Sequence, residues 1–162
     1  MTKPPKRDEA LHAELVRRAE AMVPKLLERA PQAREQRSVP KETIDEMKAA
    51  GFFRALQPAR WGGAEVHPTT FFDVARTISA ACPSSAWVLG VVSVHSWQLA
   101  LFDDRAQQDV WAKDSSVLIS SSYMPVGKAE WVDGGVKLTG HWSFSSGCDH
   151  CDWTFLGGFV PT

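Results

Sequence analysis

The sequence lacks the features that mark nucleic-acid-binding, secreted and membrane proteins. Its 18 lysines and arginines are interspersed with 19 acidic residues, so no basic face for nucleic acid is expected. A polar segment follows the basic start at residues 1–7, where a secretory signal would continue with an apolar run. The most apolar window, residues 86–102, is shorter than a membrane span and contains His95. These observations predict a cytoplasmic protein that binds neither nucleic acid nor membrane.

Familiar catalytic motifs are missing as well. The sequence contains no glycine-rich nucleotide loop, no Gly-x-Ser-x-Gly elbow and no His-Glu-x-x-His zinc motif. No pair of carboxylates stands out as an acid–base set. Because the side chains alone offer no complete catalytic set, the sequence favours a bound organic cofactor.

The three cysteines, Cys82, Cys148 and Cys151, are an odd number without a secretion signal, which is typical of reduced thiols. Cys148-Asp-His-Cys151 could hold zinc or perform thiol chemistry. Structural zinc needs four ligands, and no second cysteine pair is present at suitable spacing. A redox pair would follow a strand at a helix N-terminus, and that context is absent. We therefore predict a turn between two strands and no metal site.

Helical periodicity dominates the first two thirds of the chain. Pro31 and the polar stretch 32–38 are expected to end the first helix, and Gly51 is placed where a C-terminal cap needs positive φ. The expected helices are residues 8–29, a second that begins at Pro40, a third from Pro68 to Cys82, a buried one across 86–102, and a short one capped by Asp103 or Asp104.

The period changes to two after Asp114. Strands are expected at 117–123, 136–146 and 153–160, with a hairpin at Asp133-Gly-Gly135. Helices first and strands second indicate an α+β fold, with an all-helical domain at 1–114 and an incomplete β-domain at 115–162. A small sheet has one face to cover, and no helix follows it here, so we expect the natural polypeptide to continue.

Candidate binding residues occur on two segments. In the strand expected across 136–146, alternation would put Trp142, Phe144 and Ser146 on one face and Ser143 and Ser145 on the other. Two aromatic rings and a hydroxyl suit a planar heterocycle, and the hydroxyls of residues 120–122 could bind its carbonyl or phosphate groups. An ordinary strand with serines in solvent is the alternative.

The apolar helix carries Trp87, His95 and Trp97. His95 could be a core residue bonded to a backbone carbonyl, or a polar group that faces a cavity and binds a phenol oxygen. The sequence has seven tryptophans and one tyrosine, but large flat side chains fill cores as well as they line ligand sites.

Gly140-His-Trp-Ser-Phe144-Ser-Ser146 resembles the Gly-x-x-x-Trp-x-Thr strand of acyl-CoA dehydrogenases. Residues 120–125, Ser-Ser-Ser-Tyr-Met-Pro, depart from the Thr-Glu-Pro-Gly-rich stretch of that family. Other blocks, including Ser84-Ser-Ala-Trp87 and Val94-His-Ser-Trp97, resemble the two-component, flavin-dependent aromatic monooxygenases built on the same fold. The likeness begins near Asp8 and is greatest to oxygenase components that act on a phenolic seco-steroid in bacterial steroid catabolism.

This resemblance implies a complete architecture and reaction. It implies a C-terminal helical bundle that this chain lacks, a homotetramer, and a separate flavin reductase that supplies reduced FMN or FAD. The flavin would react with molecular oxygen at C4a, and the resulting hydroperoxide would hydroxylate a phenol ortho to its hydroxyl. As alternatives, the chain could belong to an acyl-CoA dehydrogenase with bound FAD, or be a non-catalytic interaction module.

The resemblance also implies residue roles. Ser146 would be catalytic because its hydroxyl bonds near flavin N5 and discourages loss of peroxide. His95 and Trp97 would contact the phenol in a dry pocket. The implied flavin-binding residues are Trp87, Ser121, Ser122, Trp142, Phe144, Ser145 and Ser146.

Overall fold

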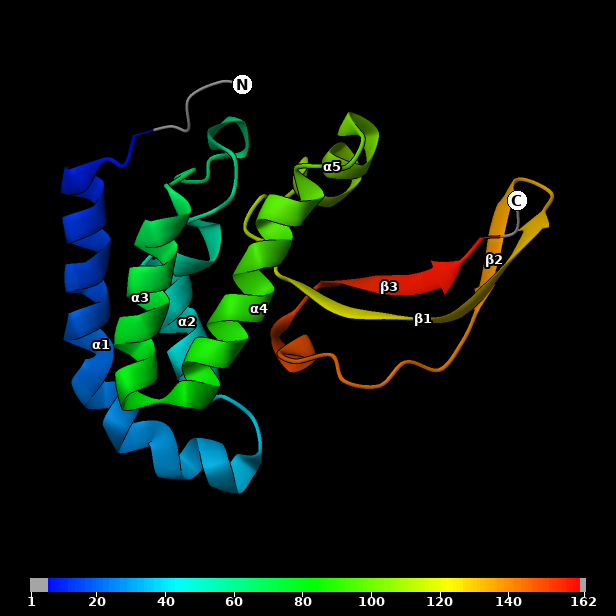
Figure 1. The fold of residues 1–162 in the computed structure, drawn as a ribbon. Helices are drawn as coiled ribbons and strands as arrows, with labels where there is room; N and C mark the ends of the chain where they lie inside the picture. The colour runs from blue at the N-terminus through cyan, green and yellow to red at the C-terminus, as the bar shows by residue number, and fades with distance from the viewer. Residues whose placement is uncertain (1–5, 161–162) are drawn as a thin grey trace.

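The computed structural model describes residues 6–160, in which helices come first and strands second, so the predicted α+β class is confirmed (Figure 1). Residues 1–5, the start of the basic segment considered above, and residues 161–162 lie outside the described residues. The elements are α1 (Glu9–Gln36), α2 (Lys41–Ala49), α3 (Pro68–Ala81), α4 (Pro83–Leu99), α5 (Asp104–Trp111), β1 (Ile119–Val132), β2 (Gly135–Thr139) and β3 (Trp153–Phe159).

Helix α1 is longer than its sequence predicts. Asp8 caps it by accepting the N–H of Leu11, and the helix then continues through Pro24 and Pro31 to Gln36. The prediction that Pro31 ends the helix was wrong, since a proline can bend a helix that tertiary contacts hold in place. Figure 1 shows the C-terminal part of α1 turning beneath the start of α4.

The other helices begin and end close to where proline, glycine and aspartate place them. Helix α2 starts after Pro40, Gly51 adopts φ 81°, and Asp103 caps α5. Helices α3 and α4 form the centre of the core, and the main buried residues on them are Phe71, Val74, Ile78, Leu89 and Val92. Helix α4 is buried on one side only, because Trp87 and Trp97 remain 64% and 51% exposed. The expectation of a buried helix was therefore wrong at Trp87 and Trp97.

Strand β1 is the centre of a sheet with the order β2-β1-β3. The expected hairpin is present, since β1 pairs antiparallel with β2 through a turn in which Gly134 adopts φ 80°. Strand β3 pairs parallel with β1, and Ile119 is opposite Trp153. In Figure 1 the sheet extends away from α4, with the start of β1 beside the helix.

The strand expected across 136–146 ends at Thr139. Residues 140–146 run without strand structure, and the φ of 57° at Phe144 lies in the left-handed region, outside the range of an extended strand. Trp142 folds toward the sheet, where its indole N–H donates to the carbonyl oxygen of Gly157 at 2.8 Å. The prediction that Trp142, Phe144 and Ser146 share one strand face was therefore wrong.

The helices end at Trp111 and β1 begins at Ile119, and these two residues share a small apolar cluster with Leu99 and Val110. The predicted boundary between residues 114 and 115 falls in the intervening connector, and the division into two domains stays a prediction. Within residues 6–160, no helix combines the length and the hydrophobicity that a membrane span requires.

Candidate functional site

His95 connects α4 to the start of β1. Its Nδ1 lies 2.7 Å from the carbonyl oxygen of Ile119. A carbonyl can only accept, so Nδ1 carries the proton and Nε2 of the neutral ring is left as an acceptor. Burial lowers the pKa of His95 below its ordinary 6.5. His95 is thus a neutral residue at pH 7, bonded to a backbone carbonyl as one of the two sequence interpretations expected.

The same histidine lines a cavity of about 270 Å³ between α4, β1 and the loop at 144–146, which we call the α4–β1 cavity. Its lining is Trp87, Val91, Val94, His95, Ser121, Tyr123, Phe144 and Ser146. The structure therefore brings together, from three separate segments, Trp87, His95, Ser121, Phe144 and Ser146 of the residues singled out in the sequence.

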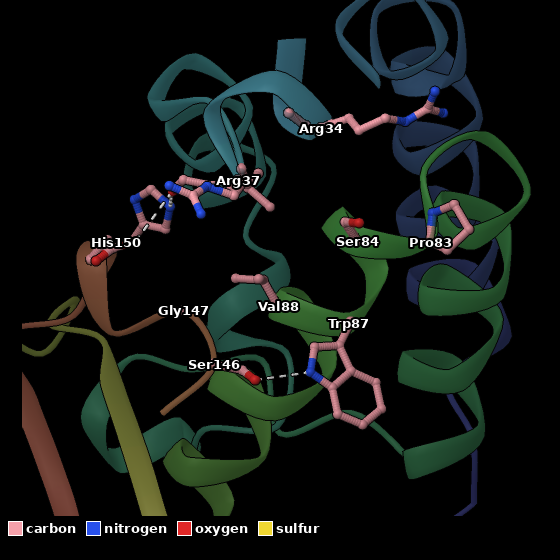
Figure 2. A pocket seen from close by; sticks show the side chains of 13 residues that line it. Arg34, Arg37, Pro83, Ser84, Trp87, Val88, Ser146, Gly147 and His150 are labelled. Atoms are coloured by element: carbon pink, nitrogen blue, oxygen red, sulfur yellow. Dashed lines mark hydrogen bonds between the residues drawn. The ribbon is translucent and has the colours of Figure 1, made fainter. Parts of the chain in front are cut away.

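Ser146 reaches this cavity from a loop that lies close to α4. The indole N–H of Trp87 donates to its hydroxyl oxygen at 3.0 Å (Figure 2). Because that hydroxyl accepts from Trp87, its own proton can be donated to a ligand. Gly147 makes the approach possible, since a Cβ there would lie 2.9 Å from Cγ2 of Val92.

Phe144 forms another part of the wall with an unusual backbone. Its φ of 57° is costly for a bulky residue, and its side chain is 93% exposed. Strain of this kind is concentrated at functional sites, where the surroundings hold it in place. The exposed ring of Phe144 offers a flat surface to a planar ligand.

Alternation along β1 decides which of its residues line the cavity. Ser121 and Tyr123 line it, whereas Ser120 and Ser122 are buried elsewhere. The hydroxyl of Ser122 donates to the carbonyl oxygen of Ser143 at 2.9 Å. Tyr123 was missed by the sequence analysis, although its spacing of two from Ser121 could have identified it.

The structure does not place every predicted site residue at the cavity. Ser122, Trp97, Trp142 and Ser145 are absent from its lining. Trp97 is two positions from His95 on α4 and therefore points to a different side of the helix. The hydroxyl of Ser145 is buried and has no hydrogen-bond partner among the described residues. The flavin or substrate roles predicted for these four residues have no geometric support.

A larger cavity of about 590 Å³ adjoins the first, and Trp87 and Ser146 belong to both (Figure 2). Its other walls come from the end of α1, the start of α4 and the turn after Gly147. The polar and charged residues that line it are Arg34, Arg37, Ser38, Ser84, Ser146, Asp149 and His150.

The Cys148–Cys151 segment forms the turn that the sequence predicts, as a short 3-10 helix at Cys148–His150. The thiol of Cys151 donates to the carbonyl oxygen of Gly147 at 3.2 Å, and burial raises its pKa to about 12. This cysteine is therefore protonated at neutral pH and a poor nucleophile. In the part of the chain that the structure describes, no three histidine, cysteine or acidic side chains are grouped to hold a metal.

Comparison with known proteins identifies the family. Residues 8–115 match the acyl-CoA dehydrogenase N-terminal domain model. The chain belongs to this family. Among solved structures, butyryl-CoA dehydrogenase from Megasphaera elsdenii superposes with a TM-score of 0.76 at 14% identity, covering 99% of this chain and 46% of that one. At that identity the likeness shows the acyl-CoA dehydrogenase fold alone.

More similar members are oxygenases. The chain is 46% identical over 145 residues to the flavin-dependent monooxygenase oxygenase subunit HsaA of Rhodococcus jostii, covering 90% of this chain and 38% of that protein. It is 36% identical over 143 residues to the oxygenase component of p-hydroxyphenylacetate 3-hydroxylase of Acinetobacter baumannii, covering 88% and 34%. The crystal structure of HsaA from Mycobacterium tuberculosis superposes with a TM-score of 0.87 at 44% identity, covering 91% and 39%. The chain spans less than two fifths of these relatives, and the resemblance found in its sequence is confirmed.

Proposed function

We propose that this chain is the N-terminal part of the oxygenase component of a reduced-flavin-dependent monooxygenase that hydroxylates a phenol ortho to its hydroxyl. The observation that carries this proposal is the α4–β1 cavity, where a neutral histidine, a serine hydroxyl and an exposed aromatic ring meet. The names of relatives support the substrate class, since they include resorcinol and p-hydroxyphenylacetate hydroxylases. A 46% identical structure is named 3-HSA hydroxylase. Because the sequence also resembles oxygenases that act on a phenolic seco-steroid, such a seco-steroid is the specific substrate we propose.

The cavity has groups that fit a flavin, either FMN or FAD. The Ser146 hydroxyl accepts from Trp87 and keeps a proton for a ring acceptor, while Phe144 presents an exposed ring to a flat heterocycle. Ser121 also lines the cavity, and its hydroxyl adds a second polar contact. When bound, the reduced flavin would supply two electrons with which molecular oxygen is split, one atom entering the phenol ring and the other leaving as water.

We assign His95 the role of binding the phenol hydroxyl. Its Nε2 accepts the hydrogen bond of the phenol hydroxyl, because Nδ1 is committed to the carbonyl oxygen of Ile119. That bond orients the ring and increases the electron density at its ortho carbon. Since burial lowers the pKa of His95, the residue accepts this bond without becoming fully protonated in the ground state.

Water must be kept from such a site, because hydration favours the release of peroxide over transfer to the phenol. Val91 and Val94 give the cavity an apolar floor, but Trp87 and Phe144 are largely exposed. In the intact protein we assign the closing of this side to a C-terminal helical bundle. We further infer a separate flavin reductase, a homotetrameric oxygenase and a cytoplasmic location.

The decisive experiment compares Ser146→Ala with Ser145→Ala in the intact protein. Ser146→Ala removes one neutral hydrogen bond to the flavin, so the affinity for reduced flavin should fall by roughly tenfold or less. More of the oxygen consumed should then appear as hydrogen peroxide and less as catechol. Ser145→Ala is the matched control, because the hydroxyl it removes has no hydrogen-bond partner within residues 6–160.

Flavin titration and the ratio of catechol to peroxide are the measurements. If Ser146→Ala couples oxygen to catechol as well as the wild type, or if Ser145→Ala is the more damaging change, the assignment of Ser146 is wrong. Oxidation of an acyl-CoA without hydroxylation of any phenol would identify the protein as a dehydrogenase instead.

A further inference from the structure

Tyr123 lies across the face of α4 that carries the substrate histidine. His95 and Gln98 are three residues apart and therefore neighbours on one side of the helix. The Tyr123 hydroxyl donates to Oε1 of Gln98 at 2.5 Å. Its ring stands edge-on to the imidazole of His95, with centroids 5.8 Å apart and planes inclined by 67°.

These contacts fix a side chain that would otherwise move. Tyr123 is 55% exposed, and an exposed tyrosine without an anchor samples several rotamers. Here the backbone is held in β1 and the hydroxyl is held by α4, so both ends of the side chain are fixed. The ring is consequently a defined wall of the α4–β1 cavity.

Phe155 offers a comparison within the same structure. Its ring is also edge-on to His95, with centroids 5.7 Å apart and planes inclined by 88°, but it is not part of the cavity lining. His95 thus has one aromatic neighbour that only supports it and another that also borders the ligand space. Variants of Phe155 and Tyr123 can therefore distinguish the effect of supporting His95 from the effect of contacting a ligand.

We propose that Tyr123, held by Gln98, determines substrate specificity by limiting which phenols can bring their hydroxyl group to His95. This inference rests on the proposed function and deepens it. A phenol whose substituent points toward Tyr123 has to fit beside the fixed ring, and a bulkier substituent is excluded. Tyr123 is a positioning and specificity-determining residue that takes no part in the transfer of oxygen.

The test uses the intact protein and a series of 4-alkylphenols of increasing chain length. Binding is measured by calorimetry without flavin, and kcat and KM are measured with reduced flavin. Tyr123→Phe and Gln98→Leu each remove the same hydrogen bond, so each should weaken the best-bound phenol by about threefold to tenfold. Because they share one interaction, the double variant should be no weaker than either single variant.

Tyr123→Ala should change the preference itself. Opening the wall should raise the affinity ratio of long-chain over short-chain phenols by roughly tenfold or more, which is the scale of methylene discrimination in apolar pockets. The matched control is Phe155→Leu, which disturbs His95 without changing the cavity lining and should weaken all phenols alike, with the ratio unchanged. The same shift should appear in KM, with little change in kcat for phenols that fit.

Two results would overturn the inference. The first is that Tyr123→Ala weakens all phenols equally, so that the affinity ratio of long-chain over short-chain phenols stays that of the wild type. The second is that the losses of affinity in Tyr123→Phe and Gln98→Leu multiply in the double variant. A shifted binding ratio in a protein that hydroxylates no phenol would support the wall and refute the proposed oxygenation. If the wild type bound no phenol of the series, the inference and the proposed substrate class would both be refuted.

Discussion

Gly147→Ala tests how firmly the loop that carries Ser146 is held against α4. Gly147 adopts φ 79°, and a Cβ there would lie 2.9 Å from Cγ2 of Val92 and 3.0 Å from Cγ1 of Val88. The left-handed backbone costs an alanine about 1–2 kcal/mol. Overpacking against the two valines adds about 1–3 kcal/mol. We therefore expect the free energy of unfolding to fall by roughly 2–5 kcal/mol if the loop keeps its place.

The loop can instead move away from α4 and relieve the contact. Stability then falls by less, but the 3.0 Å hydrogen bond between Trp87 and Ser146 is lost, and the affinity for reduced flavin should fall as in Ser146→Ala. Either outcome follows from the close approach of Gly147 to the helix.

Gly134→Ala is the matched control for this variant. Gly134 has nearly the same φ, 80°, but nothing lies within 4 Å of the Cβ it would acquire. Gly134→Ala should be destabilised only by the cost of a left-handed backbone. The free energies of unfolding of the two variants should therefore differ by about 1–3 kcal/mol, measured by urea denaturation followed by circular dichroism. Equal stability of the two variants, together with unchanged flavin affinity in Gly147→Ala, would refute the reasoning.

Two further predictions concern titratable groups. Because burial lowers the pKa of His95, the unfolded chain binds a proton there more readily than the folded chain, so the free energy of unfolding should fall as the pH drops below 6.5. Urea titrations over that range should give a smaller slope with pH in His95→Gln, and an identical slope would contradict the assignment. The double change Cys148→Ser and Cys151→Ser should leave folding and flavin affinity intact, since both residues belong to a turn and a serine at 151 keeps a donor for the carbonyl oxygen of Gly147. Stoichiometric zinc in the purified wild type would show that this view of the cysteines is wrong.

Proline, glycine and aspartate residues in the sequence predicted most of the helix boundaries. Pro40, Gly51 and Asp103 act through their own backbone or their nearest neighbours, so their effect can be read without the tertiary structure. The end of α1 could not be predicted in this way. Pro31 weakens a helix locally, but burial of Ala33 and the rest of the core keeps α1 helical to Gln36.

The site was only partly accessible from sequence. The resemblance selected Ser146 and Phe144, and both line the cavity, but they reach it from a strained loop and not from the expected strand. Alternation is informative only where a strand exists, and the positive φ of Phe144 is invisible in the residue type. Alternation from Ser121 could have placed Tyr123 at the site, but its hydrogen bond to Gln98, 25 positions away, leaves no local signal in the sequence.

The parallel pairing of β1 with β3 has a consequence for the order of folding. Helices α3 and α4 follow one another directly, so their contacts form early and at little entropic cost. Ile119 and Trp153 meet only after the hairpin and the whole loop through Ser146 have been laid down between them. Long-range parallel pairing of this kind forms slowly compared with contacts between neighbouring helices. We expect Trp87 and His95 to stand on a formed helix before the loop docks, so the binding cavity is the last part of the chain to be completed.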